Sequence, residues 1–219
     1  LRYVQKHSDS IVQIEALLFG QAGMLEDEKT QDSYHRLLQG EYEFLKHKYD
    51  LCPLEKHVFK NMRIRPTAFP QMRIAQLAAL LHRSQGLFST VVEKKDVGVL
   101  RLFFHVNASE YWQTHFSFGI ESTKKSKFLG DSSLDIILIN TVAPILFTYG
   151  KHIGDENLCE RGVYFLEQIK AEKNAITKLF SKQGIPMKSA ANSQAVIQLK
   201  KEYCDNRKCL YCRVGYQML

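Results

Sequence analysis

The segment Leu134–Phe147 is the most apolar stretch of this sequence. The helix that it predicts would carry apolar side chains on all of its faces, and a helix of that kind lies inside a protein core. With about 14 apolar-dominated residues, interrupted by Asp135, Asn140 and Pro144, it is too short and too polar to cross a bilayer. We therefore expect a fold organised around a central apolar helix at about residues 132–149.

Helical spacing of apolar residues continues through most of the remaining chain. Ser8, Asp9 and Ser10 supply capping side chains for a helix that starts near Ile11, and Pro70 is suited to the first position of another helix. The fold class that follows is all-α, an irregular multi-helix bundle. Further helices are expected in segments that share this spacing: 31–49, 155–180 and 189–203. The segment 97–106 is too short and too apolar to be assigned by periodicity; it is a buried helix or a strand, and a helix is favoured.

Two of these helices have a predicted buried face. The face of the first is a stripe of apolar and aromatic side chains at helical spacing: Tyr34, Leu37, Leu38, Tyr42, Leu45 and Tyr49. The face of the second is formed by Ile74, Leu77, Ala78 and Leu81.

The length of 219 residues and the hydrophobic content of 45% allow one large domain. We expect a single helical domain over residues 1–219. The lysine-rich segment 121–131 is predicted to be a solvated loop and is the candidate internal boundary. The chain opens without Met and without the apolar region of a signal peptide, and it has an odd number of cysteines. We therefore expect a cytoplasmic, reducing location, and a chain that is the C-terminal portion of a longer protein.

The formal net charge of +7 makes nucleic acid or another polyanion a plausible partner. Arg63, Arg65 and Arg73 lie around the predicted helix start at Pro70. The helix dipole disfavours a cation in the first turn, so Arg73 needs a compensating interaction. Either the three guanidinium groups converge on one anion, such as a phosphate, a carboxylate or a nucleic-acid backbone, or acidic side chains of the same chain pair with them.

Three of the five cysteines lie close together near the end of the chain, in the order Cys204-x4-Cys209-x2-Cys212. This spacing is a candidate metal site, for zinc or an iron–sulfur cluster. Both would need a fourth ligand, from Cys52, Cys159 or one of the histidines. Arg207, Lys208 and Arg213 surround the cysteines, and nearby cations favour the thiolate form. The alternative is a set of reduced thiols that pack in a C-terminal segment.

Several short motifs together resemble an uncharacterised, mainly Bacteroidetes family known as domain of unknown function 2851. The resemblance covers the chain from about residue 60 onward and corresponds to the C-terminal part of the family. The motifs are Arg65-Pro66-x-x-Phe69-Pro70-x-x-Arg73-Ile74-Ala75, Tyr111-Trp112, Ile139-Asn140-Thr141-Val142-x-Pro144, Ser193-Gln194-Ala195, and Cys204, Cys209, Cys212 and Gly215.

The resemblance implies a longer protein whose N-terminal part is similar in style to restriction-endonuclease-like nucleases. Any catalytic carboxylates would then lie outside this sequence, and the N-terminal domain would be a partner of this chain. The sequence itself contains no nucleophile–base motif, glycine-rich phosphate loop or paired-carboxylate signature, so we assign no catalytic residue.

We predict a helical accessory domain that prefers polyanions, nucleic acid above all. The alternatives are a structural module with a cysteine metal site and a domain that binds a small anionic ligand. We expect no membrane partner.

Overall fold

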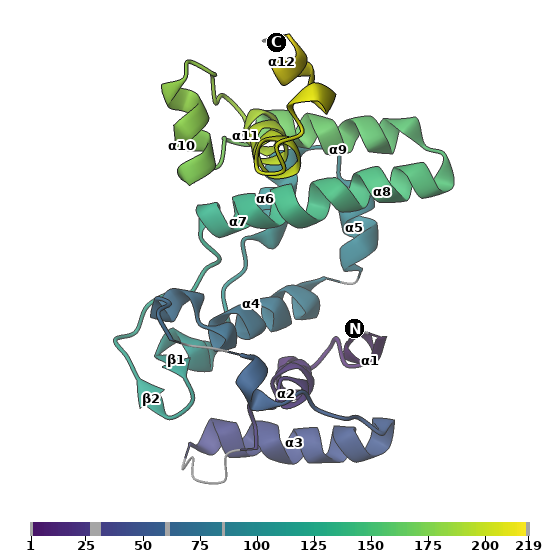
Figure 1. Ribbon diagram of the computed structural model, residues 1–219. Helices are drawn as coiled ribbons and strands as arrows, with labels where there is room; N and C mark the ends of the chain where they lie inside the picture. The colour runs from purple at the N-terminus through teal and green to yellow at the C-terminus, as the bar shows by residue number, and fades with distance from the viewer. Residues whose placement is uncertain (1, 27–31, 60–61, 85, 218–219) are drawn as a thin grey trace. The chain divides into compact units, whose positions relative to one another are not determined.

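A computed structural model describes residues 2–26, 32–59, 62–84 and 86–217 (Figure 1). Its regular structure is almost entirely helical, which confirms the all-α prediction. The chain forms two compact units, Leu1–Thr90 with Leu100–Gly130, and Val91–Val99 with Asp131–Leu219. One boundary falls inside the segment 121–131, and the prediction of a single domain stays a prediction.

The first unit is built around α2 (Ile11–Gln21), which packs against α3 (Ser33–Tyr49) and α4 (Pro70–Arg83). The expected caps are present, because Ser10 Oγ accepts from the backbone N–H of Gln13 at 3.3 Å and Pro70 opens α4. Gln31, the predicted start of α3, lies outside the described residues. The remaining elements of the unit are α1 (Arg2–Gln5), η1 (Lys56–Val58), η2 (Pro66–Ala68), η3 (Glu110–Gln113), β1 (His115–Ser117) and β2 (Ile120–Glu121).

The buried faces predicted for α3 and α4 are in the right place, but each prediction includes residues that are exposed. Leu38 and Leu45 of α3 are fully buried, whereas Leu37 is 48% exposed. In α4, Ala78 and Leu81 are buried but Leu77 is 37% exposed. Its face is rotated toward Met72 and Ala75, which join the core cluster formed with α2 and α3. Periodicity defines an apolar stripe but leaves its edges open, and the packing partners decide them.

β1 and β2 form a short antiparallel hairpin, the one sheet among the described residues. The segment that contains Lys127 returns beside it, and this lysine contradicts the prediction of a solvated loop. Lys127 is 5% exposed, and its Nζ lies 3.2 Å from the centroid of the Phe116 ring. Its carbonyl accepts from Gln76 Nε2 at 3.0 Å and its N–H donates to Asn107 Oδ1 at 2.7 Å. Burial and the neighbouring Lys125 lower the pKa of Lys127.

In the second unit, one continuous helical segment corresponds to the predicted central apolar helix. It comprises α7 (Asp131–Ile137), the π-helical η4 (Leu138–Val142) and α8 (Ala143–Ile153). α5 (Leu87–Glu93) and α6 (Val97–Phe104) each lie partly in both units, and α6 confirms the helix predicted over 97–106. The unit also contains α9 (Glu156–Gln168), α10 (Ala175–Lys182), α11 (Ala190–Gln198), the π-helical η5 (Leu199–Cys204), η6 (Cys209–Tyr211) and α12 (Arg213–Tyr216).

The segment Asp131–Ile153 differs from the prediction in two respects. It is amphipathic, since Ile136 and Phe147 are exposed while Leu138 and Leu146 are buried. Its 23 helical residues make it long and apolar enough to cross a membrane by length and composition, so the length argument above is wrong. A core helix of a soluble protein passes the same test, and the absence of a membrane partner stays a prediction.

The helix predicted over 155–180 is two helices. A helix starts next to Asp155, as expected, and Asp155 caps it through the N–H of Leu158 at 3.2 Å, but the helix ends at Gln168. Asn174 then starts α10 with a capping box, in which its Oδ1 accepts from the N–H of Thr177 at 2.9 Å. The prediction that the first helix continues to residue 180 is therefore wrong, because Asn174 starts a separate helix.

α8 and α9 lie side by side in Figure 1 and pack closely. The close approach depends on Gly162 of α9, because a Cβ at this position would lie 2.8 Å from the carbonyl oxygen of Ala143 in α8. A backbone atom cannot move aside as the end of a flexible side chain can. Gly162 thus sets the distance between the two helices.

We predict that Gly162→Ala lowers the free energy of unfolding by about 1–3 kcal/mol, because the helices must separate to admit the methyl group. Gly40→Ala is the matched control, since Gly40 lies inside α3 with no atom within 4 Å of the added Cβ. This control should raise stability by about 0.5–1 kcal/mol. Urea denaturation of both variants measures the difference, and an equal effect of the two substitutions would contradict the proposed packing.

Candidate functional site

The net charge of the chain lies in its last fifty residues. Residues 170–219 contain ten Lys or Arg and three Asp or Glu, a formal balance of +7. Residues 1–169 contain twenty of each kind and are formally neutral. The charged segment belongs entirely to the second unit.

Most of these cations face solvent. Nine of the ten are exposed and Lys200 is half-buried. Of the three acidic residues, Asp205 pairs with Lys200, and Glu172 accepts a hydrogen bond from Gln194 Nε2. The local acids therefore leave most of the positive charge available to an external anion.

The charged segment ends in a turn of the chain that we call the C-terminal hook, residues 199–217. It consists of η5, η6 and α12. Tyr211 is 83% exposed and Tyr216 is 72% exposed. Lys208 and Arg213, both exposed, lie near them in sequence. The hook thus presents aromatic rings and cations together.

The three predicted metal ligands lie in this hook. Cys204 and Cys209 are exposed, Cys212 is buried, and all three are free thiols. Cys209 O accepts from the N–H of Cys212 at 3.1 Å, and Cys212 O accepts from the N–H of Tyr216 at 2.8 Å. Among the described residues, no three His, Cys, Asp or Glu side chains are grouped so as to hold a metal ion. The hydrogen bond between Cys209 and Cys212 closes a tight turn at the x2 spacing, and zinc or an iron–sulfur cluster stays a prediction.

The three predicted anion-binding arginines belong to the first unit and differ in environment. Arg63 and Arg65 are exposed, and Arg63 has a left-handed backbone with φ 62°. Arg73 is half-buried, and its Nη1 donates to Gln76 Oε1 at 3.0 Å. Burial lowers the pKa of Arg73. Arg73 thus has a partner inside the unit, the amide of Gln76, whereas convergence of the three arginines on one anion and their pairing with acidic side chains both stay predictions.

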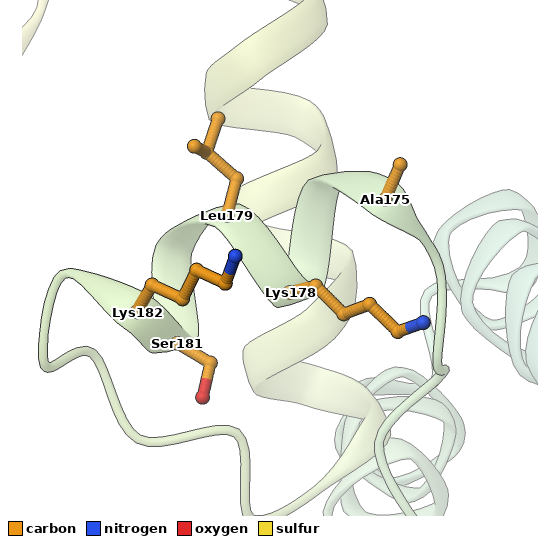
Figure 2. A pocket seen from close by; sticks show the side chains of 5 residues that line it. All are labelled: Ala175, Lys178, Leu179, Ser181 and Lys182. Carbon is orange, nitrogen blue, oxygen red and sulfur yellow. The ribbon is translucent and has the colours of Figure 1, made fainter.

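A shallow hollow of about 460 Å³ lies over α10. It is lined by Ala175, Lys178, Leu179, Ser181 and Lys182. Figure 2 shows that the amino groups of Lys178 and Lys182 point in different directions, and that Ser181 points away from Leu179. The hollow adds positive charge to the segment but does not bring its polar groups to one point.

The sequence analysis missed a buried carboxylate in the first unit. Glu15 of α2 is fully buried, and its Oε2 accepts from Tyr34 Oη at 2.9 Å and from Trp112 Nε1 at 3.0 Å. Ser109 is also close to this carboxylate, although Glu15 Oε1 and Ser109 Oγ form no hydrogen bond of normal geometry. No local pattern could identify Glu15, because its partners lie 19 and 97 residues away.

A second carboxylate holds the hairpin next to this site. Asp32 caps α3 through the N–H groups of Tyr34 and His35, and its Oδ2 accepts from Tyr111 Oη and from the N–H of Gly119 at 2.9 Å. The Tyr111 ring stacks on Tyr34 at 4.4 Å. The two acids and their aromatic donors form one network that joins α2, α3, η3 and the hairpin.

The two carboxyl groups respond to this network in opposite ways. Burial raises the pKa of Glu15 above its ordinary value of 4.5, although the hydrogen bonds from Trp112 and Tyr34 and the nearby hydroxyl of Ser109 act against it. Burial acts in the same direction on Asp32, but the hydrogen bonds from Tyr111 and the backbone outweigh it and lower the pKa of Asp32 below 3.8. The network therefore has a structural role: it holds α2, α3, η3 and the hairpin together.

Comparison with known families decides where this chain belongs. A family model described as protein of unknown function (DUF2851) matches residues 1–175. The chain belongs to the DUF2851 family. No curated protein and no solved structure matches it.

The DUF2851 match differs in extent from the resemblance described above. It begins at residue 1 and not near residue 60, and it ends before Ser193, Gln194, Ala195 and the cysteines. The Glu15 and Asp32 network therefore lies inside the DUF2851 region, whereas the C-terminal hook and most of the charged segment follow it. That the chain is the C-terminal part of its family, and that the family is mainly from Bacteroidetes, stay predictions.

We predict that the stability of the wild-type protein relative to Glu15→Gln falls as pH rises above 4.5 and through the raised pKa of Glu15. The fold disfavours the charged form of Glu15, so its contribution is fully present below 4.5 and is lost as pH rises through the raised pKa. Asp32 is common to both proteins, and its own loss of stabilisation below pH 3.8 cancels in the comparison. Urea denaturation across this pH range measures the difference.

Glu15→Leu provides the control for hydrogen bonding. It leaves the Trp112 N–H and the Tyr34 hydroxyl without their acceptor and should cost about 2–4 kcal/mol at neutral pH. A pH-independent difference between the wild type and Glu15→Gln would show that burial does not perturb Glu15 as described.

Proposed function

We propose that this chain binds nucleic acid through the charged segment, residues 170–217. The observation that carries the proposal is the distribution of charge: all of the formal net charge lies in the last fifty residues, and the cations there are exposed. Lysines and arginines on a surface release counterions from a phosphate backbone when they bind it, without reading its sequence.

The proposed role is that of a helical accessory domain. It supplies affinity for the polyanion, while catalysis belongs to a nuclease-like N-terminal domain implied by the resemblance described above. A cytoplasmic location and the absence of a membrane partner are part of the same proposal, because a nucleic-acid substrate is met there. We propose no catalytic residue in the described part of the chain.

A small anionic ligand at Arg63 and Arg65 is the second candidate. The left-handed backbone of Arg63 favours it, since uncommon backbone conformations of residues other than glycine occur often at binding sites. Arg63→Gln with Arg65→Gln separates the two candidates. If Arg63 and Arg65 bind a small anion, phosphate should raise the melting temperature of the wild type but not of this variant. If nucleic acid binds to the charged segment instead, these substitutions should leave the affinity for nucleic acid unchanged.

We predict that the wild-type protein binds a labelled oligonucleotide with an affinity that falls steeply as salt concentration rises. The triple variant Arg207→Gln, Lys208→Gln, Arg213→Gln should bind more weakly at low salt. Its slope of log affinity against log salt should be smaller by about 2, if each cation contacts one phosphate of a single strand. Fluorescence anisotropy titrations at several NaCl concentrations measure both quantities.

A matched control removes the same number of positive charges from residues 1–169, the part of the chain with no formal net charge. Arg36, Lys48 and Lys95 are exposed and lie outside residues 170–217, so their joint replacement by Gln should leave the slope unchanged. Equal losses in the two triple variants would mean that only total charge matters. Absence of oligonucleotide binding at low salt would refute the proposed function.

A further inference from the structure

The C-terminal hook has a defined internal geometry. A Cβ at Gly215 would lie 2.6 Å from the carbonyl oxygen of Cys209, so α12 and η6 touch through their backbones. The N–H of Lys208 donates to Tyr203 O at 2.9 Å and the N–H of Tyr211 to Lys208 O at 3.2 Å. These contacts fix the two short turns against each other and against the end of η5.

The side chains of the hook differ in burial. Cys212, between the two turns, is buried, whereas Tyr211 and Tyr216 are among the most exposed large side chains of the described chain. The two exposed rings, together with Leu210 at 73% and Val214 at 53% exposure, give the hook an exposed apolar surface, which indicates a binding surface.

Charge indicates which ligand this is. The exposed residues Lys208 and Arg213 precede Tyr211 and Tyr216 by three residues each, so cations and rings alternate along the hook. A ligand that matches this alternation has negative groups and flat rings in regular succession. Nucleic acid repeats a negative group and a flat ring in every nucleotide, whereas an acidic protein surface has no such regular alternation.

We propose that the C-terminal hook is a stacking platform for single-stranded nucleic acid, on which bases stack on Tyr211 and Tyr216 while Lys208 and Arg213 hold the phosphates. The inference rests on the proposed function and specifies its substrate class. In a duplex the faces of the bases are covered by their neighbours, so only a single strand offers them to the tyrosines. Charge alone attracts both forms of nucleic acid, and the rings supply the preference.

The test uses the full chain and two fluorescein-labelled probes, an oligonucleotide of about 20 nucleotides and the same strand annealed to its complement. The single strand should bind more tightly than the duplex. Tyr211→Ala and Tyr216→Ala should each weaken single-strand binding by roughly 5- to 100-fold, the range found for loss of one stacked base, and should change duplex binding little.

Three controls accompany these variants. Tyr211→Phe and Tyr216→Phe keep the rings and should retain single-strand affinity. Tyr164→Ala removes an exposed tyrosine from α9, outside the hook, and should have no effect. Gly215→Ala keeps every charge and both rings but forces α12 away from Cys209, so it should weaken single-strand binding and leave duplex binding unchanged.

The outcomes separate the two proposals. Equal affinity for both probes, unchanged by Tyr211→Ala and Tyr216→Ala, would overturn the stacking platform and leave charge-driven binding intact. No binding of either probe at low salt would overturn the proposed function as well. Loss of affinity in the phenylalanine variants would show that the hydroxyl groups, and not the rings, make the contact, and would also overturn the inference.

Discussion

The first unit depends on a carboxylate that has no access to water. Glu15 lies in the middle of α2, among side chains that form an apolar cluster of the unit. A buried carboxylate is tolerated only where donors replace its water, and here the donors come from Tyr34 in α3 and Trp112 in η3. The same contact that satisfies Glu15 therefore aligns three elements. Asp32 extends this alignment to the hairpin through Tyr111 and Gly119.

The sequence predicted those features that depend on local chemistry. The cap before Ile11 and the proline at the start of α4 have short-range causes and were predicted correctly. The errors have long-range causes. Lys127 belongs to a run of lysines and reads as solvated, but the hairpin and α4 enclose it, and the ring of Phe116 replaces part of its water.

The candidate sites also differ in whether their features depend on nearby or on distant residues. The arginine and cysteine groups were selected by spacing, and spacing does not reveal that Arg73 bonds to Gln76 or that Cys212 is buried beneath a turn. Glu15 gave no signal at all, because its donors lie far away in sequence. The exposure of Tyr211 and Tyr216 was equally out of reach, since an aromatic residue near a helical pattern is normally part of a core.

The distribution of charge divides the chain into residues 1–169, which are formally neutral, and residues 170–219, which are basic. Twenty acidic and twenty basic residues balance in residues 1–169, where the family match also lies apart from its last few residues. Residues 170–219 concentrate like charge in one unit, and like charges on a surface repel and destabilise the compact state. A basic segment of this kind is consistent with a polyanion that relieves the repulsion on binding. The close contact of Gly215 with Cys209 keeps the exposed rings in place within it.

Hydrogen–deuterium exchange with and without a single-stranded oligonucleotide at low salt reports where along the intact chain a ligand binds and requires no substitution. If the C-terminal hook binds the strand, backbone amides in residues 199–217 should exchange more slowly, and exchange in residues 1–84 should be unchanged. Protection confined to the segment around Arg63 and Arg65, or no protection anywhere, would contradict binding by the hook.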